Sequence, residues 1–149
     1  MTTTPVIHLN FSGRAREALE FYARAFDGQA IVRTYAEVGM PAEVPGADDV
    51  VWGQATGVDG FRVMAYDVPR ASDPIPVGAT RRENGATLTD QPFFVSLSAD
   101  DLAGATTNWE RLAEGATVVE PLAASAWSPG FGMLTDRFGV TWVIDVAQG

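Results

Sequence analysis

Hydrophobic and polar residues alternate at the start of the chain and then change to a helical spacing. Residues 6–11 (VIHLNF) are apolar at alternate positions from 7 onward, which predicts a strand with one buried face. Between residues 15 and 26, apolar side chains recur every three or four positions, which predicts an amphipathic helix. We expect Ser12 to cap the start of this helix and Gly28 to end it in a left-handed conformation.

Three further segments complete a supersecondary unit after this helix. Residues 29–38, 51–56 and 61–68 are predicted to be strands because they are rich in β-branched and aromatic side chains. An Asp59-Gly60 pair between the last two favours a hairpin turn, since both residue types tolerate the backbone conformation that the turn needs. The pattern therefore predicts a βαβββ unit.

The second half of the chain has the same order of elements. Residues 93–98 are predicted to form a strand, and an apolar stripe over residues 102–112 predicts a helix that Gly115 ends. Asp100 and Asp101 stand at the start of that helix, where its dipole favours acidic residues. Three strands are expected to follow, at residues 116–122, 132–135 and 140–146.

Alignment of the two halves reveals an internal repeat. A displacement of 87 residues matches the first strand and helix of each half, and one of 79 matches the later strands. The matched pairs include Pro5 with Pro92, Tyr22 with Trp109, Gly28 with Gly115, Gly53 with Gly132 and Gly60 with Gly139. The repeat predicts an α+β fold of two pseudo-symmetric βαβββ modules that form curved mixed sheets around an open cup. The modules would be residues 1–68 and 92–149 of one structural domain, with a linker or lid at 69–91.

Strand alternation separates the side chains that face each helix from those that line the cup. In the first strand, Ile7 and Leu9 are expected to face the helix, which leaves His8 and Asn10 for the cup. The same parity applies to the other strands. The predicted ligand-binding residues are His8, Asn10, Arg62, Met64, Tyr66, Phe94, Ser96 and Val143.

Composition narrows the classes of function. The 149 residues include 19 acidic and 10 basic side chains, for a net charge of −9, and only Arg81 and Arg82 are adjacent bases. A nucleic-acid partner is not expected, since phosphate backbones need clustered positive charge. The absence of cysteine excludes disulfides and thiolate metal sites. There is no apolar segment of about 20 residues and no signal-peptide pattern, so we expect a cytoplasmic protein without membrane contact.

Two βαβββ modules with Ala-Leu-Glu-Phe-Tyr (residues 18–22) in the first helix resemble the vicinal oxygen chelate superfamily. That superfamily includes glyoxalases, bleomycin-resistance proteins and extradiol dioxygenases. Residues 93–98 (FFVSLS) and 131–142 (FGMLTDRFGVTW) are similar to its PhnB-like branch, also labelled 3-demethylubiquinone methyltransferase-like. The resemblance covers nearly the whole chain. No glycine-rich loop follows a strand in a Rossmann pattern, so the sequence lacks the cofactor motif that the methyltransferase label would suggest.

The resemblance also assigns four metal-ligand positions. Metal-using members carry one ligand on each of four strands, and the matching residues here are Val6, Met64, Phe94 and Val143. None of these side chains offers an oxygen or nitrogen lone pair, which hard or borderline cations need. His8, the only histidine, is expected to bond a polar neighbour in the cup. We therefore expect no metal and no other cofactor.

Other side chains carry weaker signals. A single histidine without a nucleophile-elbow motif gives no basis for a serine nucleophile. Asp136 is expected to be a turn residue, and Trp109 and Trp142 are predicted core residues because they follow the helix-facing pattern. Trp127 lies in a predicted loop and is expected to cover a pocket mouth or a partner chain. The carboxylates expected at solvated strand ends are Glu37, Asp67 and Asp145.

The interpretation favoured by this pattern is metal-independent binding of a small apolar or aromatic molecule in the cup, oriented by a few polar groups. One alternative is a metal-dependent lyase, isomerase or dioxygenase with a rearranged site, in which His8 would meet carboxylates such as Glu37 or Asp67. Another is a structural or regulatory dimer without pocket chemistry. Whether the protein is an enzyme stays open at this point. Exposed edges of short strands favour a homodimer.

Overall fold

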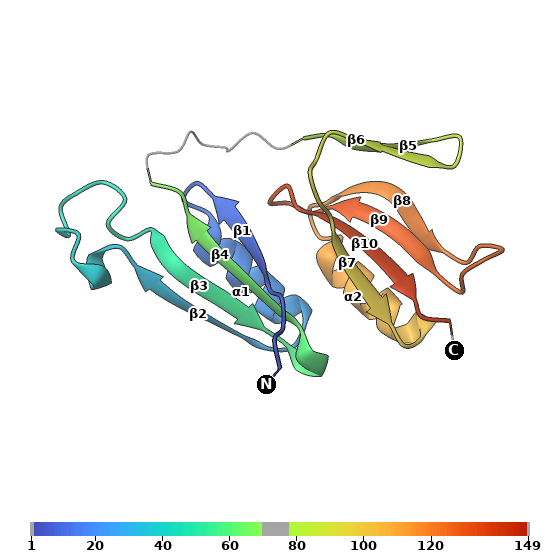
Figure 1. Ribbon diagram of the computed structural model, residues 1–149, viewed down its shortest axis with the longest axis horizontal. Helices are drawn as coiled ribbons and strands as arrows, with labels where there is room; N and C mark the ends of the chain where they lie inside the picture. Colours follow the sequence, from blue (N-terminus) through green and yellow to red (C-terminus); the bar gives the residue numbers. More distant parts are fainter. Residues whose placement is uncertain (1, 70–77, 149) are drawn as a thin grey trace. The chain divides into compact units, whose positions relative to one another are not determined.

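The computed structural model describes residues 2–69 and 78–148 and divides into two compact units, Met1–Pro76 and Val77–Gly149. Each unit contains a four-stranded sheet with an α-helix packed on one face (Figure 1). The two sheets have the same strand order relative to their helices, so the predicted α+β fold with two βαβββ modules is confirmed.

The first unit is built around the sheet order β1-β4-β3-β2. β1 and β4 are parallel, and the other neighbours are antiparallel. α1 packs against β2, β3 and β4, which leaves the opposite face of the sheet free of helix. Its elements are β1 (Ile7–Phe11), α1 (Ala15–Ala25), β2 (Gln29–Thr34), a 3₁₀ turn (Ala36–Val38), β3 (Val50–Thr56), a 3₁₀ turn (Val58–Gly60) and β4 (Arg62–Asp67).

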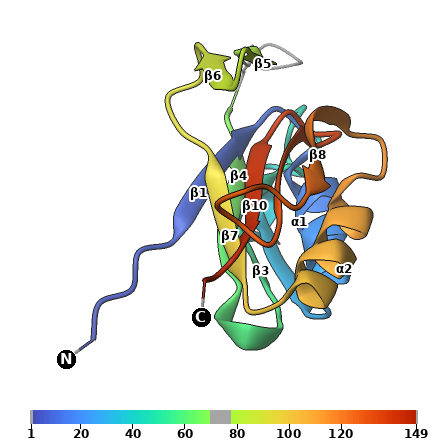
Figure 2. The ribbon, with the colours of Figure 1, turned by 90° about the vertical axis from the view of Figure 1, so that its right-hand side faces the viewer.

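The second unit repeats this arrangement with the order β7-β10-β9-β8. β7 and β10 are parallel, and β9 pairs antiparallel with both β10 and β8. Figure 2 shows α2 lying along one face of this sheet. Its elements are β5 (Thr80–Glu83), β6 (Ala86–Thr89), β7 (Val95–Ala99), α2 (Leu102–Leu112), β8 (Thr117–Ala123), β9 (Phe131–Thr135) and β10 (Thr141–Val146).

Burial follows the predicted alternation in both sheets. In β1 the side chains of Leu9 and Phe11 are buried, whereas His8 and Asn10 are exposed. In β10 Trp142 and Ile144 are fully buried, which confirms Trp142 as a core residue. We call the face of each sheet opposite its helix the helix-free face.

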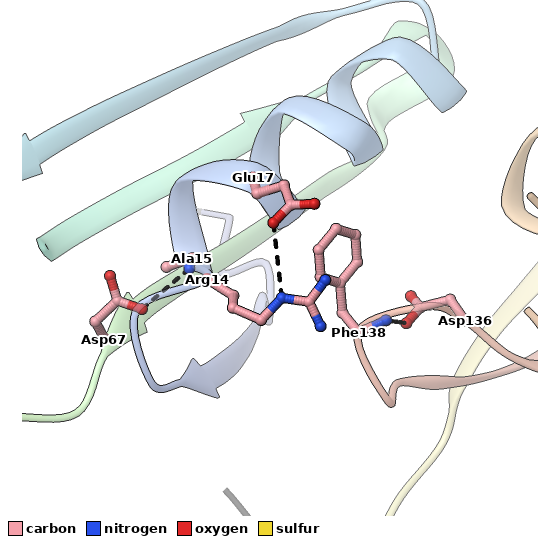
Figure 3. Close-up of polar contacts among 6 residues, drawn as sticks. All are labelled: Arg14, Ala15, Glu17, Asp67, Asp136 and Phe138. Atoms are coloured by element: carbon pink, nitrogen blue, oxygen red, sulfur yellow. Dashed lines mark hydrogen bonds and ion pairs between the residues drawn. The ribbon is translucent and has the colours of Figure 1, made fainter. Parts of the chain in front are cut away.

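The ends of α1 differ from the sequence prediction. Ser12 does not cap the helix, because α1 begins only at Ala15. Instead, the backbone N–H of Ala15 donates to Oδ1 of Asp67 over 3.0 Å (Figure 3). Gly28 is not the left-handed residue either, since Asp27 takes that conformation with φ of 55°. Gly28 is required for a different reason: the backbone of Thr56 occupies the space that a Cβ atom would fill.

The ends of α2 agree with the prediction. Asp101 is the N-cap residue, and its Oδ1 accepts a hydrogen bond of 2.7 Å from the backbone N–H of Gly104. Gly115 follows the helix with a left-handed φ of 73°. An aspartate cap of this kind stabilises a helix by about 0.5–2 kcal/mol relative to alanine.

The strand predicted at residues 29–38 is shorter than expected. β2 ends at Thr34, where the pairing with β3 is irregular, and the chain then turns. The N–H of Thr34 donates to Glu37 over 2.7 Å, and the N–H of Glu37 donates back to the Thr34 hydroxyl over 3.2 Å. These local side-chain bonds satisfy backbone groups that the strand ladder would otherwise use.

A hairpin lies within the segment predicted to be a linker or lid. β5 and β6 are antiparallel and are joined by Asn84 and Gly85, which have positive φ values of 51° and 78°. An Asn-Gly pair is the strongest short-range signal for this type of turn, so the sequence held information that the prediction did not use. The rest of the segment, at residues 70–77, lies outside the described residues.

Candidate functional site

The first candidate surface is the helix-free face of the first sheet. Strand register places His8 beside Met64, and Asn10 beside Tyr66, on the neighbouring strands β1 and β4. These four side chains therefore form one block, as the alternation predicted. Arg62 follows the same parity at the start of β4.

Contacts within this block hold its polar groups in place. The rings of His8 and Tyr66 meet edge to face, with centroids 5.3 Å apart and planes at 67°. Nδ1 of His8 lies 3.3 Å from Oδ1 of Asn10, and Nε of Arg62 donates to Oε1 of Gln54 over 3.2 Å. His8 thus bonds a polar neighbour, as expected. The arrangement can present hydrogen-bonding groups beside an aromatic ring. Among these contacts, His8 does not bond a serine or threonine hydroxyl.

The metal-ligand positions implied by the family resemblance lie partly on the helix-free faces. Met64 stands between His8 and Gln54, and Val143 stands between Ser96 and Met133. A thioether and an alkyl group do not fit the oxygen and nitrogen preference of hard or borderline cations. The other two positions, Val6 and Phe94, lie just before β1 and β7 and are half-buried. Within residues 2–69 and 78–148, no three histidine, cysteine or carboxylate side chains converge in a way that could hold a metal ion.

The second candidate surface is the helix-free face of the second sheet. Ser96 and Ser98 of β7 are register partners of Val143 and Asp145 of β10. On the other side of β10, Met133 and Phe131 of β9 pair with the same two residues. Oδ1 of Asp145 is buried and has no hydrogen-bond partner within the described residues. Asp145 was expected at a solvated strand end, and this expectation is wrong for Oδ1.

The β5–β6 hairpin packs on this same face. The hydroxyl of Thr87 donates to Sδ of Met133 over 3.6 Å. The guanidinium of Arg82 lies 5.5 Å from the ring centroid of Phe131, and its Nε is 3.8 Å from a carboxylate oxygen of Glu120. Met133 is consequently 1% exposed although it faces away from α2. The hairpin covers the part of the face near β8 and β9.

A hydroxyl network anchors the chain between the hairpin and β7. Oε1 of Gln91 accepts hydrogen bonds of 2.6 Å from both Thr80 and Thr141. The hydroxyls of Thr141 and Thr135 lie 2.7 Å apart across β9 and β10. No local sequence signal indicates this network, because Gln91 and Thr141 are 50 residues apart in the chain.

Two buried aspartates have structural tasks. Asp67, expected at a solvated strand end, is 2% exposed and accepts from the N–H groups of Ala15 and Val50. Asp136 accepts from the N–H of Phe138 over 2.8 Å, as Figure 3 shows, and from the indole of Trp142 over 2.8 Å. The prediction for Asp67 is therefore wrong, and the interpretation of Asp136 as a turn residue is confirmed. Both carboxylates are engaged by donors of the protein itself.

Near the end of β4, several acidic groups lie close together. Burial raises the pKa of Asp49, and the negative charges of Asp67 and Asp48 add to this rise. Burial also raises the pKa of Tyr35, with further contributions from Tyr66, Asp67 and Asp49. The hydroxyl of Tyr35 donates to the backbone oxygen of Asp67 over 2.7 Å. Proton binding at Asp49 is therefore coupled to folding.

Three tryptophans differ in their surroundings. Trp142 is fully buried, whereas Trp109 of α2 is half-buried against Gly132 of β9. Trp127 is 65% exposed in the loop before β9, and its backbone oxygen accepts from the Gln148 side chain. That Trp127 covers a pocket mouth or a partner chain therefore stays a prediction.

Comparison with known proteins identifies the family. The family model described as Glyoxalase/Bleomycin resistance protein/Dioxygenase superfamily matches residues 7–144. The chain belongs to this superfamily. Protein YjdN of Escherichia coli (strain K12) is 24% identical over an alignment of 147 positions, which covers 95% of this chain and 93% of that protein.

Solved structures of other proteins share this fold. Protein PA1353 from Pseudomonas aeruginosa is 28% identical with a TM-score of 0.75, and the match covers 99% of this chain and 100% of that one. A PhnB protein from Bacillus cereus is 21% identical with a TM-score of 0.72, over 97% of this chain and 100% of that one. The predicted superfamily is confirmed by the family model, and the PhnB protein has the same fold. Over the described residues, no helix has the length and apolar character needed to cross a membrane.

Proposed function

We propose that the protein binds a small, largely apolar or aromatic molecule on its helix-free faces without a metal ion. The superfamily fold is that of small-molecule-binding or enzyme-like proteins, and the proposal adds the class of ligand. Binding would use His8, Asn10, Arg62, Met64 and Tyr66 on the first sheet and Phe94, Ser96 and Val143 on the second.

The observation that carries this proposal is the make-up of the first helix-free face. Met64 and Tyr66 offer half-exposed apolar and aromatic surface, and His8 and Asn10 frame it with hydrogen-bonding groups. Ligand pockets are typically apolar with a small number of polar groups that fix orientation. The contact of the His8 and Tyr66 rings orders these side chains before any ligand arrives, which lowers the entropy cost of binding.

The metal-dependent alternative is less well supported by the chain's own residues. It would need His8 to meet a carboxylate such as Glu37 or Asp67. Glu37 binds the backbone of Thr34 in a turn, and Asp67 points to the helix side of β4, where it binds two backbone N–H groups. With both carboxylates engaged away from His8, a rearranged metal centre would require at least one of them to leave these contacts.

A thermal-shift screen on dialysed protein tests the proposal. Probes would be small neutral aromatics such as indole, 2-naphthol and 2-phenylethanol, with metal content measured on the same sample. A ligand at 100 times its dissociation constant should stabilise the fold by about 2.7 kcal/mol. His8→Ala should weaken binding of any hit while the unliganded melting temperature holds. Arg24→Ala, which removes an exposed side chain from α1, is the matched control and should bind like the parent.

The outcomes separate the candidate functions. Metal-free protein with an aromatic hit sensitive to His8→Ala supports the proposal. Near-stoichiometric zinc, nickel or iron that is lost on His8→Ala would instead favour the metal-dependent enzyme. A complete lack of hits in a broad screen would favour the structural or regulatory dimer.

A further inference from the structure

Asp145 places an unpaired carboxylate oxygen on the helix-free face of the second sheet. Its neighbours in the strand register are Ser98 on β7 and Phe131 on β9, and Val143 precedes it on the same face. Its Oδ1 is buried but meets no hydrogen-bond donor within the described residues. An unpaired buried carboxylate oxygen is costly, so a folded protein retains one mainly where something outside the chain supplies the donor.

Two buried polar atoms on this face, Oδ1 of Asp145 and Nε of Arg82, make no hydrogen bond within the described residues. The charged side chains that the described strands β7 to β10 place on it are Glu120 and Asp145, and the hairpin adds Arg82. Arg82 forms its ion pair with Glu120 and donates through Nη1 to the hydroxyl of Thr87 over 2.8 Å. Glu120, Asp145 and Arg82 together leave one negative charge on this face, and none of the described side chains donates a hydrogen bond to Oδ1 of Asp145.

The residues around Asp145 suit a body that is apolar or aromatic. Phe131 and Val143 are half-buried and offer ring and alkyl surface next to the carboxylate. Ser96 and Ser98 are exposed on β7 and can exchange hydrogen bonds with the same molecule. The surface thus combines one anionic acceptor, one aromatic ring and two hydroxyls.

We propose that the ligand of this face carries a protonated amine on a small aromatic body, and that Oδ1 of Asp145 accepts the hydrogen bond of the ammonium group. The inference rests on the proposed small-molecule binding function and specifies its ligand class. Hydrogen bonds between an ammonium and a carboxylate are charge-assisted and about twice as strong as neutral ones. A neutral alcohol of the same shape would gain the apolar contacts and a weaker hydrogen bond.

The test compares two probes of nearly equal shape, 2-phenylethylamine and 2-phenylethanol, by titration calorimetry at neutral pH. The parent protein should bind the amine on the order of tenfold more tightly than the alcohol. Asp145→Asn keeps the size of the side chain and removes its charge, so it should bind both probes with the affinity of the alcohol. Glu120→Gln is the matched control, since it removes one negative charge from the same face, and it should keep the preference for the amine.

Each outcome decides between the two proposals. Binding of both probes to the parent with equal affinity would overturn the amine inference, because solvent would then satisfy Asp145, and would leave small-molecule binding in place. A preference that persists in Asp145→Asn would also overturn it. If the parent binds neither probe, the amine inference fails, and the neutral screen decides separately on the proposed function. The comparison on the parent needs no variant, so it holds even if Asp145→Asn does not fold.

Discussion

Gly53 of β3 and Gly132 of β9 hold equivalent places in the two sheets, and each lies directly beneath a large side chain of its helix. A Cβ atom at Gly53 would lie 2.5 Å from Cδ1 of Leu19, and one at Gly132 would lie 2.7 Å from Cζ3 of Trp109. Both helices therefore approach their sheets closely at the same point of the repeat. The helix-free faces depend on this packing, because it fixes which side of each sheet the helix covers.

Alanine at either glycine should destabilise the protein by about 1–3 kcal/mol, the usual cost of overpacking a core. Gly53→Ala and Gly132→Ala should respond differently to a second substitution, one that shortens the helix side chain above the glycine. At Gly53→Ala the nearest atom is the end of the Leu19 side chain, so Leu19→Ala should offset part of the cost in a double-mutant cycle.

At Gly132→Ala, backbone atoms of Leu122 lie 2.8 and 3.0 Å from the new Cβ, and no change at Trp109 can remove them. Chemical denaturation of the single and double variants measures both couplings. If shortening the helix side chain recovered the same share of the lost stability at both glycines, the backbone of Leu122 would not limit the space at Gly132.

Removal of the large aromatic residues on the two helices should cost unequal amounts. Tyr22 of α1 is fully buried, so Tyr22→Ala should cost about 3–5 kcal/mol of unfolding free energy. Trp109 is half-buried, and Trp109→Ala should cost clearly less. Melting curves of the two variants give the comparison, and variants that melt within a degree of the parent would contradict the core assignment.

Asp49 should make stability depend on pH. Its pKa is raised in the folded state, so the folded protein binds a proton at Asp49 more tightly than the unfolded chain does. The resulting stabilisation is complete below the ordinary aspartate pKa of about 4 and is lost as the pH rises through the raised pKa. Asp49→Asn should therefore raise the melting temperature at pH 7 and have little effect at pH 3.

Asp48→Asn provides the control for this prediction. It removes the same charge from an exposed neighbour and should raise the melting temperature less than Asp49→Asn at pH 7. If Asp49→Asn lowers the melting temperature at pH 7, the ionised carboxylate makes a favourable contact and the sign of the argument is wrong.

Thr141 should control how firmly residues 78–91 are attached to the second sheet. Thr141→Val keeps the shape but removes the hydroxyl that bonds Gln91 and Thr135, whereas Thr141→Ser keeps a hydroxyl. A buried partner left unpaired costs about 1–3 kcal/mol. Hydrogen exchange of β5 and β6 should accelerate in the valine variant and change little in the serine variant. Equal exchange rates in the valine and serine variants would mean that the hydrogen bonds of Thr141 do not hold the β5–β6 hairpin on the sheet.

The sequence predicted most of the fold because the repeat and the strand alternation are local signals. His8 and Asn10 could be placed on the helix-free face from the apolar residues on either side of them. Features that depend on contacts distant in sequence were not predictable. Asp67 supplies the bond at the start of α1 from 52 residues away, and so Ser12 was the wrong cap.

The candidate site was predictable only in part, for the same reason. Parity identified Val143 and Asp145 as residues of one face, but it could not show that Oδ1 of Asp145 would be buried without a partner among the described residues. The Asn84-Gly85 turn was visible in the sequence. Where the hairpin would pack was not, because its contact with Met133 spans 46 residues.

A homodimer is the expected assembly. Ile31 on the edge strand β2 is 53% exposed and Trp127 is 65% exposed, and large apolar side chains of this kind are often covered by a partner chain. Light scattering at micromolar concentration should give twice the chain mass of 15.9 kDa, with an interface on the order of 1,600 Å². A mass equal to that of one chain would contradict this prediction.

The most direct test of metal-independent binding is the affinity of one aromatic ligand before and after removal of metal. The dissociation constant of a hit from the neutral screen would be measured by titration calorimetry on protein dialysed with EDTA and on the same protein with added zinc or nickel. We predict dissociation constants that agree within about twofold, since the positions that the family resemblance assigns to metal ligands include Met64 and Val143, which offer no oxygen or nitrogen ligand. Loss of binding after chelation, with recovery when the metal is returned, would contradict metal-independent binding.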